Sequence, residues 1–195
     1  MNVQAAEVLE LFRQTGAYLT GHFLLTSGLH SPAYLQCARV LQFPAQARLL
    51  GDRLAAELSK LAPEVDVVVS PAMGGLIVGH EVARALGVRH IFTERGEDRK
   101  MVLRRGFAIH PGERAVVVED VITTGVSTRE VIELLRAAGA SVLAASSIID
   151  RSGGTAHVST PRVALATLSV ETWKPDDCPL CREGIPIVKP GSRPA

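Results

Sequence analysis

The sequence predicts an α/β fold, a parallel sheet flanked by helices. Short apolar runs rich in valine, such as 65–70 and 115–120, are typical of strands buried on both faces. Amphipathic helical segments alternate with these runs, and such alternation favours a parallel sheet. The 195 residues, 47% of them hydrophobic, are enough to bury one core, so we expect a single domain.

The first 62 residues differ from this alternation and predict a small hood beside the sheet. A helix is expected over 3–15, followed by a stretch punctuated by Gly, Ser and Pro at 21–36. A second helix begins at Pro44, a residue suited to the first helical turn. One face of that helix is expected to carry Leu50, Leu54, Leu58 and Leu61.

From residue 63 to 170 we expect the α/β core. Its expected elements are a strand at 65–70, a helix at 76–87 ended by Gly87, strands at 88–94, 101–109 and 115–120, a helix at 127–139 and a strand at 141–150. The helix at 127–139 has a capping-box pattern, Ser127 with Glu130, and a Gly139 stop. The tail, 171–195, is dense in Pro and Gly and is expected to run over the surface or to be partly disordered.

Charge and cysteine content narrow the class of protein. Twenty-one basic against twenty acidic residues give a net charge of +1, so nucleic acid and anionic membranes are not expected partners. The N-terminal pattern lacks a signal peptide, and no segment is long enough to span a bilayer. Three unevenly placed cysteines do not predict a disulfide framework, and we expect a cytoplasmic protein.

The stretch VVVEDVITTGVST, 116–128, predicts an anion site. It follows a buried strand, and ligands of open parallel sheets bind beyond the carboxyl ends of their strands. Small residues leading into a helix offer backbone N–H groups and hydroxyls to a phosphate. Glu119 and Asp120 just before them suit hydroxyls or metal-bound water, so a sugar phosphate fits both parts. An ordinary strand-to-helix turn remains the alternative interpretation.

This stretch resembles the phosphoribosyl-pyrophosphate signature of the type I phosphoribosyltransferases. The chain is most similar to the members of that family that act on orotate, over about 11–154. The segment 21–36 resembles their base-binding segment, and 70–75, SPAMGG, resembles their pyrophosphate loop. The Asp150-Arg151 pair resembles the one from which an arginine reaches orotate. The resemblance implies the type I phosphoribosyltransferase fold with a small N-terminal hood and a flexible loop.

The resemblance also implies roles for individual residues. Those implied for phosphoribosyl pyrophosphate are Glu119, Asp120, Val121, Ile122, Thr123, Thr124, Gly125, Val126 and Ser127, with Ala72, Met73 and Gly74 along the pyrophosphate. Those implied for orotate are Thr123, Arg151, Tyr34 and Thr26. A mobile catalytic loop is implied at 93–106, and the implied catalytic residues are Lys100, Arg95 and Asp120.

The chain departs from the family pattern at several positively charged positions. Thr26 and Gly74 stand where the family commonly has lysine. The family's catalytic loop usually includes a histidine, but the nearest one here, His110, lies past the following strand. The arginines that could compensate are Arg99, Arg104 and Arg105.

The implied activity is phosphoribosyl transfer to orotate in pyrimidine biosynthesis, with Mg²⁺ held mainly by substrate oxygens and with a homodimer that shares the catalytic loop. Two alternatives stay open. One is transfer to a purine base, which the missing lysine at 26 would favour. The other is a regulator of the same fold that senses phosphoribosyl pyrophosphate and binds nucleic acid, against which the net charge counts.

The pair Cys178 and Cys181 forms a C-x-x-C motif in the tail, which is half of a zinc site. A second pair is missing and Cys37 is single, so we expect free thiols first and a metal site bridging two subunits second. The histidines show no metal-ligand spacing, and no role is predicted for His22, His30, His80, His90, His110 or His157.

Overall fold

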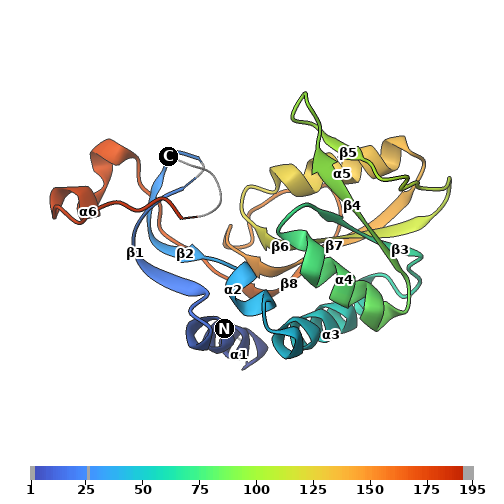
Figure 1. Ribbon diagram of the computed structural model, residues 1–195, viewed down its shortest axis with the longest axis horizontal. Helices are drawn as coiled ribbons and strands as arrows, with labels where there is room; N and C mark the ends of the chain where they lie inside the picture. The colour runs from blue at the N-terminus through green and yellow to red at the C-terminus, as the bar shows by residue number, and fades with distance from the viewer. Residues whose placement is uncertain (1–2, 26, 191–195) are drawn as a thin grey trace.

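A computed structural model describes residues 3–25 and 27–190 of the chain. Its main sheet has the strand order β5-β4-β3-β6-β7-β8, and helices lie on both faces (Figure 1). The strands are β3 (Val67–Pro71), β4 (Arg89–Arg95), β5 (Met101–Leu103), β6 (Arg114–Ile122), β7 (Ser141–Asp150) and β8 (Arg162–Thr167). The helices are α1 (Val3–Gln14), α2 (Ala38–Leu41), α3 (Pro44–Leu61), α4 (Gly75–Leu86), α5 (Val126–Ala137) and α6 (Pro179–Arg182).

The sheet is parallel except at β5, which pairs antiparallel with β4 at one edge. The predicted α/β fold with a parallel sheet is therefore confirmed. Strand β8 at the other edge was not expected, because its residues carry Arg162 and Thr167 at the ends and only a short apolar centre. In the described part of the chain, no helix is both long and apolar enough to cross a membrane.

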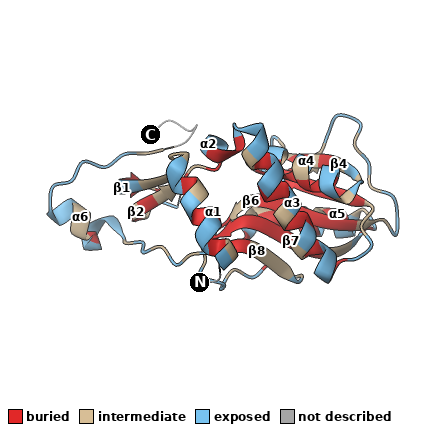
Figure 2. Ribbon diagram, turned by 90° about the horizontal axis from the view of Figure 1, so that it is seen from below, coloured by how far each residue is buried: buried red, intermediate tan, exposed pale blue. Residues whose placement is uncertain are grey.

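Alternate residues of each central strand point to opposite faces and build two apolar layers. Val68 and Val116 pack with helices α1, α3 and α4, whereas Val67 and Val117 pack with α5. Figure 2 shows the central strands buried between helices whose outer faces are exposed. In α3 the predicted leucine face holds for Leu50, Leu54 and Leu58, but Leu61 is 46% exposed because the helix ends there.

The segment 101–109, predicted as one strand, forms only the three residues of β5. The chain then turns, since Arg105 and Gly106 both have positive φ, at 59° and 74°. Arg105 is held in this turn by hydrogen bonds of 2.9 Å to both carboxylate oxygens of Glu94.

The hood predicted over the first 62 residues is wrong in its extent, because α1 and α3 pack on the main sheet. The part that forms a hood is the antiparallel hairpin of β1 (Tyr18–Leu24) and β2 (His30–Leu35), and the tail packs against it. Trp173 exchanges backbone hydrogen bonds of 2.8 and 3.0 Å with His30. Val188 donates to the carbonyl of His22 and accepts from Leu24, at 2.8 and 2.9 Å. Between these points the tail forms η1 (Pro175–Asp177) and α6, so up to residue 190 it is more ordered than its Pro and Gly content predicts. In both views α6 lies beyond the hairpin, away from the main sheet (Figure 1 and Figure 2).

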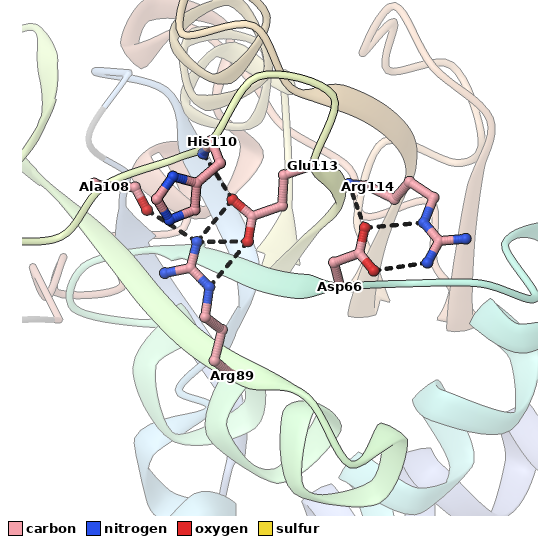
Figure 3. Close-up of polar contacts among 6 residues, drawn as sticks. All are labelled: Asp66, Arg89, Ala108, His110, Glu113 and Arg114. Atoms are coloured by element: carbon pink, nitrogen blue, oxygen red, sulfur yellow. Dashed lines mark hydrogen bonds and ion pairs between the residues drawn. The ribbon is translucent and has the colours of Figure 1, made fainter.

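Ion pairs join the loops at the amino ends of the strands (Figure 3). Asp66, just before β3, accepts two hydrogen bonds from the guanidinium of Arg114, at 2.7 and 2.9 Å, and one from its backbone N–H. Arg89, at the start of β4, pairs in the same way with Glu113 at 2.6 to 3.0 Å. The hydrogen bonds that Arg114 donates to Asp66 hold the pKa of the Asp66 carboxyl well below its usual range.

We expect Asp66→Asn to lower the free energy of unfolding at neutral pH. A lowered carboxylate pKa contributes stability above the unfolded pKa, near 4, and that contribution is lost as the pH falls toward the folded pKa. The difference between wild type and variant should therefore shrink below about pH 4. Urea midpoints measured from pH 7 to pH 3 check this, and a difference that is constant with pH would contradict it.

Candidate active site

The predicted site segments meet where the carboxyl ends of the parallel strands lie, called here the carboxyl edge of the sheet. Strands β4, β3, β6 and β7 are neighbours in that order, and their carboxyl ends lie at one edge because they are parallel. The segments that follow these strands are 96–100, 72–74, 123–125 and 151–154. Pairing of Ile122 with Asp150 brings the last two together, and the Arg151 backbone N–H donates to the carbonyl of Ile122 at 2.8 Å.

Glu119 and Asp120 form a carboxylate pair near the end of β6, with Glu119 buried and Asp120 half-buried. Glu119 is 8% exposed. Burial raises the pKa of Glu119 well above its usual range, and the neighbouring Asp120 raises it further. Burial also raises the pKa of Asp120, although hydrogen bonds from Glu119 and from the Val121 N–H, at 2.7 Å, oppose that shift. Two acids held this close to one another are prepared to bind hydroxyl groups or a cation.

The segment Thr123–Gly125 leads directly into α5. Gly125 is the N-cap with φ 75°, a left-handed conformation, and a Cβ at this position would lie 2.9 Å from Val158 Cγ1. Thr123 and Thr124 are exposed. Because the first turn of a helix leaves its backbone N–H groups without helical acceptors, this edge offers donors to an anion.

The predicted capping box at Ser127 and Glu130 is wrong. The helix begins one residue earlier, at Val126, and its cap has no side-chain hydrogen bond. Both side chains instead contact Arg95 at the end of β4: Ser127 Oγ accepts from Nη2 at 3.3 Å, and Glu130 pairs with Nη1 at 2.5 Å. Arg95 therefore lies beside the predicted phosphate segment of its own chain.

The loop 72–74 lies against the acid pair. It joins β3 to α4, its Ala72–Met73 peptide is cis, and Met73 is exposed. A Cβ at Gly74 would lie only 2.6 Å from Asp120 Oδ1. Glycine at 74 thus allows this backbone to approach the carboxylate closely, which a lysine side chain would disturb.

Tyr34 of the hood lies near both Asp120 and Arg151, the residue that follows β7. Burial raises the pKa of the Tyr34 hydroxyl, and Asp120 raises it further, whereas Arg151 lowers it. Burial lowers the pKa of Arg151. In the described chain no carboxylate pairs with Arg151, whereas Asp150 is paired with Arg162 and Ser152. The half-buried guanidinium is therefore available to an anionic ligand.

Cys37 is a residue of this site that the sequence analysis missed. It is buried, and its thiol hydrogen-bonds to Asp120; burial, Asp120 and Glu119 all raise its pKa. Its position in the sequence could have indicated this, because Cys37 directly follows the predicted base-binding segment, 21–36.

The segment 96–100 projects beyond the sheet between β4 and β5 (Figure 1). The Lys100 side chain is 82% exposed and contacts Asp98 at 3.8 Å. Of the predicted catalytic residues, Arg95 and Asp120 thus lie at the carboxyl edge, and Lys100 extends into solvent. Thr26, predicted for the base, lies outside the described residues.

These features describe a site for a sugar phosphate at the carboxyl ends of a parallel sheet, and similarity to known proteins gives its class: the chain is a phosphoribosyltransferase. The family model described as "Phosphoribosyl transferase domain" matches residues 40–179.

Similar proteins show which kind of phosphoribosyltransferase this chain resembles. Orotate phosphoribosyltransferase from Pelotomaculum thermopropionicum is 54% identical over 187 residues, 96% of this chain and 97% of that protein. The one from Thermotoga petrophila is 51% identical, over 95% and 98% of the two chains. The crystal structure of orotate phosphoribosyltransferase from Aeropyrum pernix superimposes with a TM-score of 0.70 at 29% identity, covering 83% of this chain and 93% of that one. The chain belongs to the orotate phosphoribosyltransferase family.

Proposed function

We propose that this protein transfers the phosphoribosyl group from phosphoribosyl pyrophosphate to orotate, giving orotidine 5′-phosphate and pyrophosphate in pyrimidine biosynthesis. The observation that carries this choice is the half-buried guanidinium of Arg151, which lies near Tyr34 and has no carboxylate partner in the described chain. Orotate carries a carboxylate that a guanidinium can bind with two parallel hydrogen bonds. Purine bases lack this group, so the geometry favours orotate over the purine alternative.

The residue roles follow the order of segments along the sheet edge. We infer that Glu119 and Asp120 bind the ribose hydroxyls and that Thr123–Ser127 binds the 5-phosphate. The loop 72–74 would then lie along the pyrophosphate, and Arg151, Tyr34 and Thr123 would lie toward orotate. For Thr26, contact with orotate stays a prediction from the sequence. The close approach of the Gly74 backbone to the Asp120 carboxylate supports a pyrophosphate bound next to the ribose hydroxyls.

The reaction forms a bond between an orotate ring nitrogen and the sugar C1 and breaks the bond from C1 to the pyrophosphate oxygen. Positive charge develops on the ribose and negative charge on the leaving pyrophosphate. The Asp120 carboxylate would stabilise the first, while Arg95 and Lys100 would neutralise the second. Closure of 93–106 would exclude water, which otherwise hydrolyses the activated sugar.

The donor set of the site fits Mg²⁺. The carboxylates of Glu119 and Asp120 offer oxygen atoms, which Mg²⁺ prefers, but they supply only part of its octahedral shell. We infer that substrate oxygens supply most of the rest. Mg²⁺, when bound, would add positive charge next to the pyrophosphate.

A homodimer is part of the proposal. The Lys100 side chain is 82% exposed, and its ion pair with Asp98 is long at 3.8 Å, so it could serve the site of a second subunit. We also infer a cytoplasmic location, since no disulfide joins Cys37, Cys178 and Cys181, as a reducing compartment favours.

The test of the proposed function is an assay with phosphoribosyl pyrophosphate and each base in turn. We expect orotate absorbance to fall only when phosphoribosyl pyrophosphate and Mg²⁺ are both present, with stoichiometric release of pyrophosphate. Consumption of adenine or hypoxanthine in place of orotate would overturn the proposal.

Arg151→Gln is expected to raise the KM for orotate by roughly 10- to 100-fold, since a hydrogen bond to a charged group contributes about 1.5 to 3 kcal/mol. The KM for phosphoribosyl pyrophosphate should change far less, because Arg151 lies on the base side of Asp120. Initial rates at varied concentrations of each substrate separate the two constants. Equal increases in both would contradict the assignment of Arg151 to orotate.

A further inference from the structure

Four side chains with metal-binding atoms meet where the tail packs against the hood. They are distant in sequence from the acid pair, Glu119 and Asp120. His22 lies on β1, His30 begins β2, Cys178 precedes α6 and Cys181 lies within α6. Their ligand atoms all lie within 4.8 Å of one another. The C-x-x-C motif, half of a zinc site in the sequence, thus receives its other half from the hairpin.

The distances among these atoms fit a tetrahedral metal site. His22 Nε2 and His30 Nδ1 are 2.9 Å apart. Cys178 Sγ lies 3.5 Å and Cys181 Sγ 3.7 Å from His22 Nε2, and Cys181 Sγ lies 3.3 Å from His30 Nδ1. Tetrahedral zinc with its usual bonds to nitrogen and sulfur separates its ligand atoms by about 3.3 to 3.8 Å. The three sulfur–nitrogen distances given lie in this range, the two nitrogen atoms are closer together, and no two ligand atoms are more than 4.8 Å apart. Small adjustments of the side chains would therefore complete the site.

The surroundings of His22 prepare it to bind a metal. His22 is 3% exposed, His30 7% and Cys178 is fully buried. His22 Nδ1 lies 2.8 Å from the carbonyl oxygen of Ile185. An N–H at Nδ1 donates to this carbonyl, so Nε2 keeps its lone pair directed at His30 and the thiols. Such a second hydrogen bond is the usual support of a metal-binding histidine.

Neither hydrogen bonding nor a disulfide accounts for the whole cluster. A hydrogen bond from His30 to His22 would satisfy the two rings, but it leaves both sulfurs with only weak interactions. A disulfide would use the cysteines alone, and both are free in the structure. A metal ion, in contrast, would use all four converging atoms.

The geometry points to a structural Zn²⁺ site made by His22, His30, Cys178 and Cys181 of one chain. Two sulfur and two nitrogen ligands in a tetrahedron select zinc among the common metals. Because all four positions belong to protein side chains, the site is closed and structural in kind. Exposure of Cys181 gives the ion a path of entry.

Such an ion would fasten the tail to the hood. The tail touches the hairpin on either side of the cluster, through Trp173 at His30 and Val188 at His22. The ion would close this segment onto β1 and β2 at a third point. Strand β2 continues to Tyr34, so the ion would also stiffen the strand that carries this tyrosine.

Metal analysis of untagged protein, purified without chelator, tests the site directly. We expect about one zinc per chain after gel filtration and release of that zinc when a mercurial reagent blocks the thiols. Replacement by Co²⁺ should give the visible bands of a tetrahedral ion and a thiolate charge-transfer band in the near ultraviolet. Less than about 0.2 equivalents of any metal, with no uptake of added Zn²⁺ or Co²⁺, would overturn the inference.

Matched cysteine variants locate the ion. Cys181→Ser, at the exposed ligand, should lose most of the zinc and the near-ultraviolet band, whereas Cys37→Ser should retain both. Removal of zinc should lower the melting temperature and speed proteolysis between 174 and 188, and added Zn²⁺ should reverse both effects. Full zinc content in Cys181→Ser, or an intact Cys178–Cys181 disulfide in the native protein, would refute the site. These readouts do not depend on enzymatic activity.

Discussion

Asp120→Asn is expected to lower kcat/KM for phosphoribosyl pyrophosphate by on the order of 10²-fold or more, as loss of a well-placed charge does in other active sites. Asparagine keeps the size of the side chain and can still accept the hydrogen bond that the Val121 N–H donates to Asp120. It removes the negative charge that faces the ribose in the proposed complex. Steady-state kinetics with saturating orotate and Mg²⁺ measure the change.

The same substitution should not destabilise the protein. Burial and the second carboxylate raise the pKa of both acids, so keeping Glu119 and Asp120 ionised costs stability as the pH rises through their folded pKa values. Removing one charge relieves this cost. The melting temperature of Asp120→Asn, relative to wild type, should therefore be higher at pH 8 than at pH 5.

Asp66→Asn is the matched control, because it makes the same chemical change at the opposite edge of the sheet. Asp66 gains its stability from Arg114 and contacts no part of the proposed site. We expect Asp66→Asn to lose stability and keep activity, and Asp120→Asn to do the reverse. Unchanged kinetics in Asp120→Asn would count heavily against the assigned site.

The sequence predicted the central sheet well because its signals are local. Valine-rich runs and glycine stops, as at Gly87 with φ 71°, report burial and chain reversal within a few residues. Right-handed connections between parallel strands then limit the strand order. Segments 72–74, 119–127 and residue 151 lie close together because they are at the carboxyl ends of neighbouring parallel strands.

Features that depend on distant contacts escaped prediction. The apparent capping box at Ser127 and Glu130 has the right spacing, but Arg95 from another strand engages both side chains. His22 and His30 show no metal-ligand spacing along the chain, since the hairpin and the tail together create the cluster. Proline and glycine in the tail suggested disorder. The sequence did not show that the tail pairs with β1 and β2, because these strands lie far earlier in the chain.

Lys100→Ala is expected to lower kcat by on the order of 10²-fold, since it removes a charge that would stabilise the departing pyrophosphate. Lys100 is exposed and holds no strand in place, so the melting temperature should remain unchanged. Single-turnover rates at saturating substrate measure the loss. A variant with wild-type kcat would remove Lys100 from the catalytic residues.

Mixed dimers decide which subunit Lys100 serves. In a dimer of one Lys100→Ala chain and one Asp120→Asn chain, a loop that crosses the interface leaves one site with both native residues. A loop that serves its own chain leaves every site with one defect. Random pairing of equal amounts after dissociation and reassembly should therefore restore about a quarter of wild-type activity in the first case and none in the second. Because each parent variant should keep only about 1% of wild-type activity, recovery to about a quarter must come from a site that two chains build together.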